Sequence, residues 1–97
     1  MNFEQSNGYT IVQSVRFNDG GGFAIGIDKK AAFPLVTWQF TEQEDGSKTY
    51  FCGYYHTLEN ADNVKLEYDE RIKKYESENP GITVKSVTAT SLQAALN

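Results

Sequence analysis

The sequence is poor in the residues that most often build metal and redox sites. Its 97 residues include one cysteine, Cys52, and one histidine, His56. A single cysteine excludes an intramolecular disulfide and favours a reducing compartment. A structural zinc site needs about four ligands, drawn mainly from Cys and His. We therefore expect neither a metal nor an organic cofactor.

Long apolar runs and an excess of basic residues are also missing. The longest largely apolar segment, 31–36, is far shorter than the about 20 residues that span a bilayer. The first residues lack the basic and apolar regions of a signal peptide, so we expect a cytoplasmic protein without membrane contact. Thirteen acidic residues against nine basic ones give a net charge of −4. Because nucleic-acid binding needs clustered Lys and Arg, we expect no direct nucleic-acid binding.

What is present is a series of strand patterns and one helix pattern. Alternating β-branched and aromatic residues predict strands over 9–17, 23–27, 35–41, 48–56 and 82–87. The first two strands are expected to form a hairpin through a loop of about five residues, 18–22. Apolar residues spaced by three and four predict an amphipathic helix over 58–78, ended by Asn79-Pro80-Gly81.

These elements predict an α+β domain over 1–97. Its mainly antiparallel sheet, in the chain order ββββαβ, packs one face against the amphipathic helix. Residues 1–8 and 91–97 are candidates for frayed termini, and 91–96 is alternatively a short helix. Gly53 lies inside a strand pattern, which is typical of a bulge or of close packing against a neighbour.

The helix sequence also predicts its own stabilising contacts. Thr57 or Asn60 is expected to cap the N-terminus. Three acid-to-base pairs spaced by four residues are each expected to contribute about 0.2–0.5 kcal/mol. They are Glu67–Arg71, Asp69–Lys73 and Glu70–Lys74.

No motif in the sequence predicts catalysis. The glycine run 20–22 precedes a strand pattern, so it lacks the helix N-terminus of a phosphate-binding loop. Cys52 and His56 are four residues apart on one strand, about 13 Å at strand rise, too far for a nucleophile and its base. A rival hypothesis is a small hydrolase or transferase that uses His56 with a carboxylate such as Glu59. General acid–base chemistry needs a positioned partner and a pocket, and we expect no enzymatic activity.

Aromatic residues are the most unusual feature. Trp38 and Phe40 share one face of a predicted strand, and the next strand carries several further rings. Because the helix covers only one face of the sheet, the rings on the other face form either a partly exposed platform or a second small core. Interfaces between proteins are enriched in such rings. We predict a protein-binding surface with aromatic anchors Trp38, Tyr50, Tyr54 and Tyr55 and a charged rim of Glu42, Glu44 and Asp45.

The middle of the chain resembles a group of small accessory domains found in conjugative and plasmid-borne elements. The resemblance lies in the pattern GxxxxxxxPxVTWxF over 26–40, the Gly-Tyr-Tyr triplet at 53–55 and the helix of mixed charge that follows, within 23–76. It carries no catalytic residue. It implies an accessory protein of a mobile element, of a kind that in some cases acts against host restriction or CRISPR systems.

Two functional hypotheses follow. In the first, the protein is an acidic inhibitor that binds a host nucleic-acid-handling defence complex, toward whose basic channel its charge would steer it. In the alternative, it is a regulatory or scaffolding adaptor that binds a protein or peptide by adding a strand to an exposed sheet edge. The first depends on side-chain charge, and the second depends on main-chain pairing.

Overall fold

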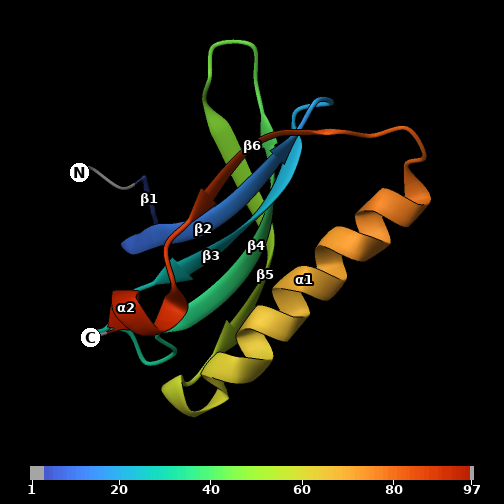
Figure 1. The fold of residues 1–97 in the computed structure, drawn as a ribbon. Coiled ribbons are helices and arrows are strands. Elements are labelled where there is room, and N and C mark those ends of the chain that lie inside the picture. The colour runs from blue at the N-terminus through green and yellow to red at the C-terminus, as the bar shows by residue number, and fades with distance from the viewer. Residues whose placement is uncertain (1–3, 97) are drawn as a thin grey trace.

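A computed structural model describes residues 4–96 and contains an antiparallel sheet, one long helix and a short C-terminal helix (Figure 1). The predicted α+β class is confirmed. The elements are β1 Gln5–Ser6, β2 Tyr9–Phe17, β3 Gly21–Ile27, β4 Leu35–Glu42, β5 Lys48–His56, the 3-10 turn Leu58–Asn60, α1 Ala61–Glu78, β6 Val84–Ala89 and α2 Leu92–Leu96.

The sheet has the order β1-β2-β3-β4-β5, and all of its pairings are antiparallel. Strand β6 pairs with the second half of β2, whereas β1 pairs with its first two residues. Strand β5 therefore forms one edge of the sheet, and β1 and β6 share the other (Figure 1).

Several boundaries differ from the sequence-based expectations. The last strand, β6, covers 84–89 instead of the predicted 82–87, because its pairing with β2 runs from Val84 to Ala89. Strand β1 and helix α2 occupy segments that were candidates for frayed termini; residues 1–3 and 97 lie outside the described residues. The loop between β2 and β3 is shorter than five residues because Gly21 and Gly22 belong to β3. A side chain at Gly22 would collide with the Phe40 ring, so this glycine is a packing position within the strand.

Helix α1 covers the sheet face that we call the helix face. Val64 and Tyr68 of α1 are buried there against side chains from β2, β3 and β4, such as Phe17, Ile25 and Leu35. The apolar stripe predicted for the helix is thus the side that packs, and Leu66, which falls off the stripe, is exposed.

The predicted polar contacts of α1 are not formed. Neither Thr57 nor Asn60 makes a capping hydrogen bond through its side chain. Within 4–96, the only ion pair between two α1 residues joins Lys65 to Asp69, at 3.1 Å, instead of any of the three predicted pairs. Glu67 and Arg71 point toward the sheet and bond there.

The opposite face, which we call the concave face, holds a second small core without a helix. Its buried members are Tyr9, Ile11, Ala24, Val36, Trp38 and Phe40. The sheet curls over them: the ring of Tyr9 on β2 lies 6.0 Å from that of Tyr55 on β5, although β3 and β4 separate the two strands. Glu4, just before β1, accepts hydrogen bonds from Lys48 and Tyr50 of β5. Of the two arrangements left open by the sequence, the second small core is the one observed.

Candidate functional site

A β-bulge in β5 decides where the aromatic side chains of this strand point. Thr37 pairs with Tyr54 and Gln39 pairs with Phe51, so Cys52 and Gly53 together lie opposite Trp38. Cys52 adopts a left-handed φ of 52°, which is uncommon for a residue with a side chain. The extra residue reverses the alternation of the strand beyond it. The bulge expected at Gly53 is thus present.

On the concave face, Tyr50 and Tyr55 lie on either side of the bulge and contact Trp38. Their ring centroids are 5.3 Å and 6.3 Å from that of Trp38, and Tyr9 approaches the same indole at 5.5 Å. Trp38 is only 3% exposed. The prediction that Trp38 is a contact anchor is therefore corrected: it is enclosed by these rings and supports them from below.

On the helix face, Tyr54 packs under the guanidinium of Arg71. The Arg71 Cζ atom lies 4.5 Å from the Tyr54 ring centroid and 5.5 Å from that of Phe23, which is within the range of cation–π attraction. Loss of hydration lowers the pKa of Arg71, while Tyr54, Glu67 and Cys52 act in the opposite direction. The stack holds Tyr54 in one orientation although half of its surface is open to solvent.

Large apolar side chains remain exposed along β5 and just after it. Tyr54 is 52% exposed and Tyr55 47%, and Phe51 and Leu58, which the sequence analysis did not select, are 37% and 50% exposed. We call Phe51, Tyr54, Tyr55 and Leu58 the β5 surface. Because β5 is an edge strand, a partner can reach both of its faces from the open side. The sequence signal for Phe51 was its position two residues before Gly53, the glycine inside the strand pattern.

A polar network fastens β5 to α1 beneath this surface. Arg71 donates hydrogen bonds to the hydroxyl and the carbonyl oxygen of Thr37, at 2.9 Å and 3.0 Å, and to the carbonyl oxygen of Cys52 at 2.9 Å. The last bond holds the left-handed residue of the bulge. Since Thr37 is fully buried, these bonds replace the water that its polar atoms lose on folding. The network therefore fixes the position of the β5 surface relative to the helix.

The one histidine belongs to the same network. His56 Nε2 lies 3.1 Å from Glu67 Oε1, which also accepts a hydrogen bond of 2.5 Å from the Thr37 hydroxyl. The carboxylate beside His56 is thus Glu67, whereas the enzyme hypothesis had suggested Glu59. Because Glu67 already bonds to a fully buried hydroxyl, the pair is placed to join α1 to the sheet.

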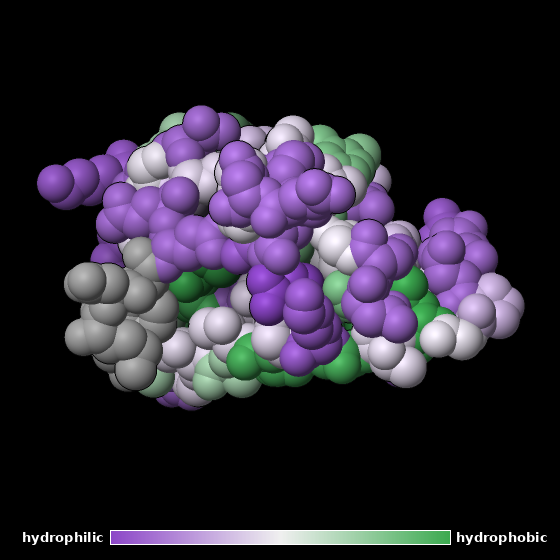
Figure 2. All heavy atoms as spheres, turned by 90° about the horizontal axis from the view of Figure 1, so that it is seen from above, coloured by the Kyte–Doolittle hydropathy of each residue, from purple (hydrophilic) through white to green (hydrophobic). Residues whose placement is uncertain are grey.

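The three acids predicted as a charged rim are placed differently from one another. Glu42 is bound to Arg16 at 2.5 Å and its side chain is 15% exposed; this hydrogen bond is the main reason that its pKa is lowered. Glu44 and Asp45 are exposed at the tip of the β4–β5 hairpin, at the end of the molecule where hydrophilic side chains dominate (Figure 2). Asp45 accepts hydrogen bonds from the Ser47 amide and hydroxyl, which lower its pKa and stabilise the turn. Of the three predicted acids, only Glu44 and Asp45 are exposed enough to contact a partner.

A shallow hollow of about 200 Å³ lies next to Tyr54, between β5 and α1. Tyr54, Cys52 and Arg71 line one part of it, and Lys74 and Glu78 from the last turns of α1 line another. This space is smaller than the about 300–1,000 Å³ of a typical small-molecule site. Its size suits a single side chain of a partner protein better than a cofactor.

Residues 4–96 contain neither a metal-binding cluster nor a membrane-spanning helix. No group of three or more His, Cys, Asp or Glu side chains in this part of the chain is arranged to hold a metal ion. None of its helices is long and apolar enough to cross a membrane.

Comparison of the chain with protein-family models, curated proteins and solved structures finds no match.

Proposed function

We propose that the protein is a non-catalytic module that binds a protein partner through the β5 surface. The observation that supports this proposal is that Tyr54, Tyr55 and Leu58 are about half exposed within five residues of one another, although the molecule buries two cores elsewhere. Tyrosine is enriched among residues that dominate binding energy. Large apolar side chains exposed on both faces of an ordered edge strand are typical of an interaction site.

The support beneath these rings favours binding without large rearrangement. Tyr54 is stacked on Arg71, and Tyr55 packs against Trp38 and Tyr9. Side chains that are already ordered lose less conformational entropy when a partner immobilises them, and each such side chain otherwise costs about 0.5–1.5 kcal/mol. The β5 surface is therefore preorganised.

The bulge favours docking by side chains over strand addition. A partner strand needs a regular row of main-chain groups, and the two-residue bulge at 52–53 interrupts that row in the middle of β5. Strand β6, at the other edge, has its own register shift where it pairs with Arg16 and Phe17. The adaptor hypothesis is therefore kept, with recognition through the side chains of the β5 surface instead of by strand addition.

The more specific hypothesis, an acidic inhibitor of a nucleic-acid-handling defence complex from a mobile element, depends on charge at the hairpin tip. Glu42 is neutralised by Arg16, so Glu44 and Asp45 are the acids that would face a basic channel. These two residues can be changed without touching the β5 surface. The inhibitor hypothesis can therefore be tested apart from the binding proposal.

The experiment combines affinity capture from the source cells with binding measurements on the purified partner. The double variant Tyr54→Ala, Tyr55→Ala is expected to lose at least about tenfold in affinity, because two anchor truncations typically cost more than 1 kcal/mol each. Leu66→Ala, which truncates an equally exposed residue on the outer side of α1, is the matched control and should leave affinity unchanged. Far-ultraviolet circular dichroism verifies that each variant folds.

The outcomes separate the hypotheses. Equal affinity of the double variant and the Leu66 control for the captured partner would refute the β5 surface as the binding site. The inhibitor hypothesis would be supported if the captured partner handles nucleic acid and its binding is lost when Glu44 and Asp45 are both changed to Lys. A partner without such a role, retained by the charge-reversed variant, would leave the adaptor as the function.

A further inference from the structure

Strand β6 is an edge of the sheet with no neighbour on its outer side. It pairs with β2, and within residues 4–96 no other strand pairs with it. Figure 1 shows β6 along the side of β2 that faces away from β3. All residues of β6 are exposed, and Val87, at 63%, is the most exposed large apolar residue of the described chain. An open edge of this kind is a template for a further strand.

The hydrogen bonds to β2 determine which main-chain groups of β6 point outward. The Thr90 amide, just beyond β6, donates to the Val12 carbonyl at 3.0 Å. The pairing of β6 with β2 then keeps one register over 86–89. Main-chain groups of successive residues alternate in direction along an antiparallel strand. Val87 and Ala89 therefore direct their N–H and C=O groups to the open side, where no strand of the described residues lies to bond them.

Most of this edge lacks the features that usually prevent strand pairing. Edges are commonly protected by charged residues, proline, bulges or very short strands. Strand β5 has its bulge at 52–53, and β1 has only two residues. In β6 the register shift falls at Lys85, at the start of the strand. The run 86–91 that follows contains neither a charged residue nor a proline, so it is the unprotected part of the edge.

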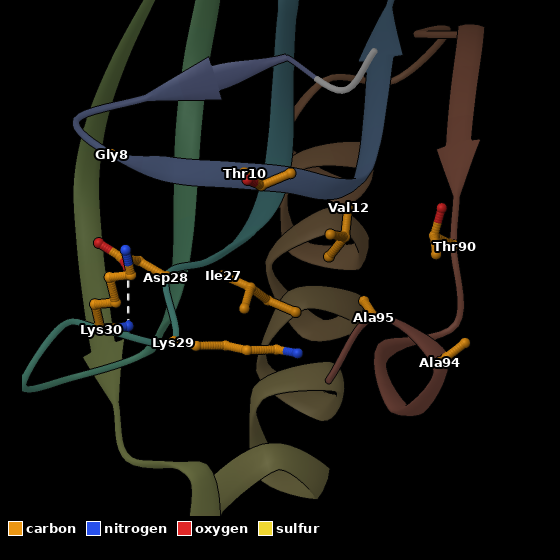
Figure 3. Close-up of a pocket in the computed structure, with 10 residues that line it drawn as sticks. All are labelled: Gly8, Thr10, Val12, Ile27, Asp28, Lys29, Lys30, Thr90, Ala94 and Ala95. Atoms are coloured by element: carbon orange, nitrogen blue, oxygen red, sulfur yellow. Dashed lines mark hydrogen bonds between the residues drawn. The ribbon is translucent and has the colours of Figure 1, made fainter. Parts of the chain in front are cut away.

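The chain that follows β6 turns onto the inner side of the edge. Leu92 and Leu96 of α2 pack against the core of the helix face. Ala94 and Ala95 line a pocket of about 700 Å³ whose other walls come from β2 and the end of β3 (Figure 3). Helix α2 therefore lies over β2, and Ala89 remains exposed although α2 begins soon after it.

The edge of a second copy of the chain is complementary to this one. When a twofold axis passes beside Thr88, two β6 strands run antiparallel and Val87 lies opposite Ala89 of the second copy. Each such pair exchanges both of its main-chain hydrogen bonds, so the outward groups of both copies are satisfied. Thr88 then faces Thr88 of the second copy, and pairs of threonines across two strands are favourable.

The charges near this edge also favour a second copy over a charged peptide. Two molecules of net charge −4 repel each other in general. Along 86–91, however, no charged side chain of one copy meets a like charge of the other. Lys85 comes near Ser91 of the second copy and stays away from its own counterpart. A charged peptide would find no opposite charge along the same run.

We propose that the protein forms a twofold homodimer by antiparallel pairing of β6 with β6 of a second copy. A contact through one pair of strands is smaller than the interfaces of stable dimers, so the dimer forms at high protein concentration. The joined sheet has a β5 strand at each end. The dimer is thus bivalent for a partner of the β5 surface, a consequence that rests on the proposed function, whereas the pairing itself does not.

Two measurements on the natural protein test the pairing. Sedimentation equilibrium up to millimolar concentration should show a monomer–dimer equilibrium. Amide hydrogen exchange, followed by nuclear magnetic resonance at low and high concentration, locates the interface. The Val87 and Ala89 amides should exchange rapidly in dilute protein and become protected as the dimer forms. The Thr88 amide, which faces β2, should be protected at both concentrations and is the internal control.

A proline variant removes the outward hydrogen bonds. Ala89→Pro deletes an N–H that points away from β2, and proline is tolerated on edge strands when the missing N–H faces solvent. The dimer loses one hydrogen bond in each of its two Val87–Ala89 pairs. Its Kd should therefore rise at least about fivefold.

Charge variants test the register. Thr88→Lys and Thr88→Glu each place two like charges opposite each other at the twofold axis, so each variant alone should dimerise more weakly than the natural protein. An equimolar mixture places lysine opposite glutamate and should dimerise at least about threefold more tightly than either variant alone. Leu66→Lys adds the same charge on the exposed side of α1 and, as the matched control, should leave the Kd unchanged.

Several results would overturn the proposal. A protein that stays monomeric at every concentration would leave this edge to a strand of another protein. Equal dimerisation of Ala89→Pro and the natural protein, or protection that appears at β5 amides instead, would place the contact elsewhere. If circular dichroism shows that Ala89→Pro does not fold, the Thr88 variants decide, because Thr88 is exposed; a mixture that dimerises no better than its components refutes the register. No partner protein enters these measurements, so their failure is distinct from failure of the β5 surface.

Discussion

Replacing Gly53 by alanine tests whether the bulge positions the aromatic rings as the structure indicates. A Cβ atom at this position would lie 2.6 Å from Trp38 Nε1, 2.9 Å from Trp38 Cδ1 and 3.0 Å from Tyr55 Cε1. Favourable contacts between such atoms begin at about 3.5 Å. Trp38 cannot move away freely, because Tyr9 and Tyr50 pack against it at 5.5 Å and 5.3 Å. The methyl group must therefore displace the indole, Tyr55 or the strand.

The expected cost follows from two opposing effects. Forcing an extra methyl group into a packed site destabilises a protein by about 1–3 kcal/mol. Replacing glycine by alanine also restricts the unfolded chain, which offsets about 0.4–1 kcal/mol. We expect a net loss of about 1–2 kcal/mol in the free energy of unfolding. For a domain of this size, that loss corresponds to a Tm lower by about 4–16 °C.

A double-mutant cycle identifies the cause of this loss. The two Trp38 atoms nearest to the new methyl group, Nε1 and Cδ1, belong to the ring bonded to Cβ, and Trp38→Val removes that ring while keeping a residue that favours strands. In the Trp38→Val background, Gly53→Ala should therefore cost at least about 1 kcal/mol less than in the natural sequence. Urea denaturation followed by far-ultraviolet circular dichroism serves all four proteins. Equal costs in the two backgrounds, or no cost in either, would refute the packing of the bulge against the indole.

Two further predictions concern the helix face. Arg71→Met keeps an apolar stem over Tyr54 but removes the hydrogen-bond donors to Thr37 and Cys52. The free energy of unfolding, measured by urea denaturation, should therefore fall by about 1–3 kcal/mol. The exposed control Lys74→Met should change it by less than about 0.5 kcal/mol. The hydrogen bond to Asp19, followed by burial, raises the pKa of Tyr75 to about 12. The unfolded chain releases this proton near pH 10, so stability should be complete below about pH 10 and fall as pH rises toward about 12. Urea titrations across this range should show a steeper fall for the natural protein than for Tyr75→Phe, and identical slopes would contradict the assignment.

The sequence predicted most elements of the fold because their periodicities are strong. Val36, Trp38 and Phe40 alternate with Leu35, Thr37 and Gln39, and the structure places the first set in the concave core and turns the second toward the helix face. The helix pattern over 58–78 matches α1 and the 3-10 turn before it, and the helix ends where Asn79-Pro80-Gly81 begins. Such local signals do not depend on the rest of the molecule.

Strand β1 and the curl of the sheet could not be predicted in the same way. A strand of two residues has no periodicity, and Gln5 and Ser6 are held in it by pairing with Thr10 and Tyr9. The contact of Glu4 with Lys48 joins segments more than 40 residues apart. These features depend on how distant segments meet, which a pattern within one segment does not report.

The candidate site was only partly predictable for a related reason. Tyr54 and Tyr55 were identified from composition and are exposed, but Trp38 and Glu42 are not available because long-range neighbours enclose or neutralise them. Glu67 and Arg71 looked like an ion pair along the helix, yet both reach the sheet, where buried polar groups offer stronger bonds than a solvated pair. Spacing along a helix indicates which residues can meet and does not indicate which competing partner they prefer.

The bulge has a consequence for how the length of β5 can vary. Removing one residue at 52–53 would restore simple alternation and turn residues 54–56 over, because side chains of a strand change face with each residue. Tyr55 would then point toward α1, and the Tyr54 ring would leave Arg71 for the concave core, where Trp38 already fills the space. The strand thus tolerates replacement of its side chains more readily than a change in their number. A related sequence that lacks one residue here would need a different set of rings in both cores.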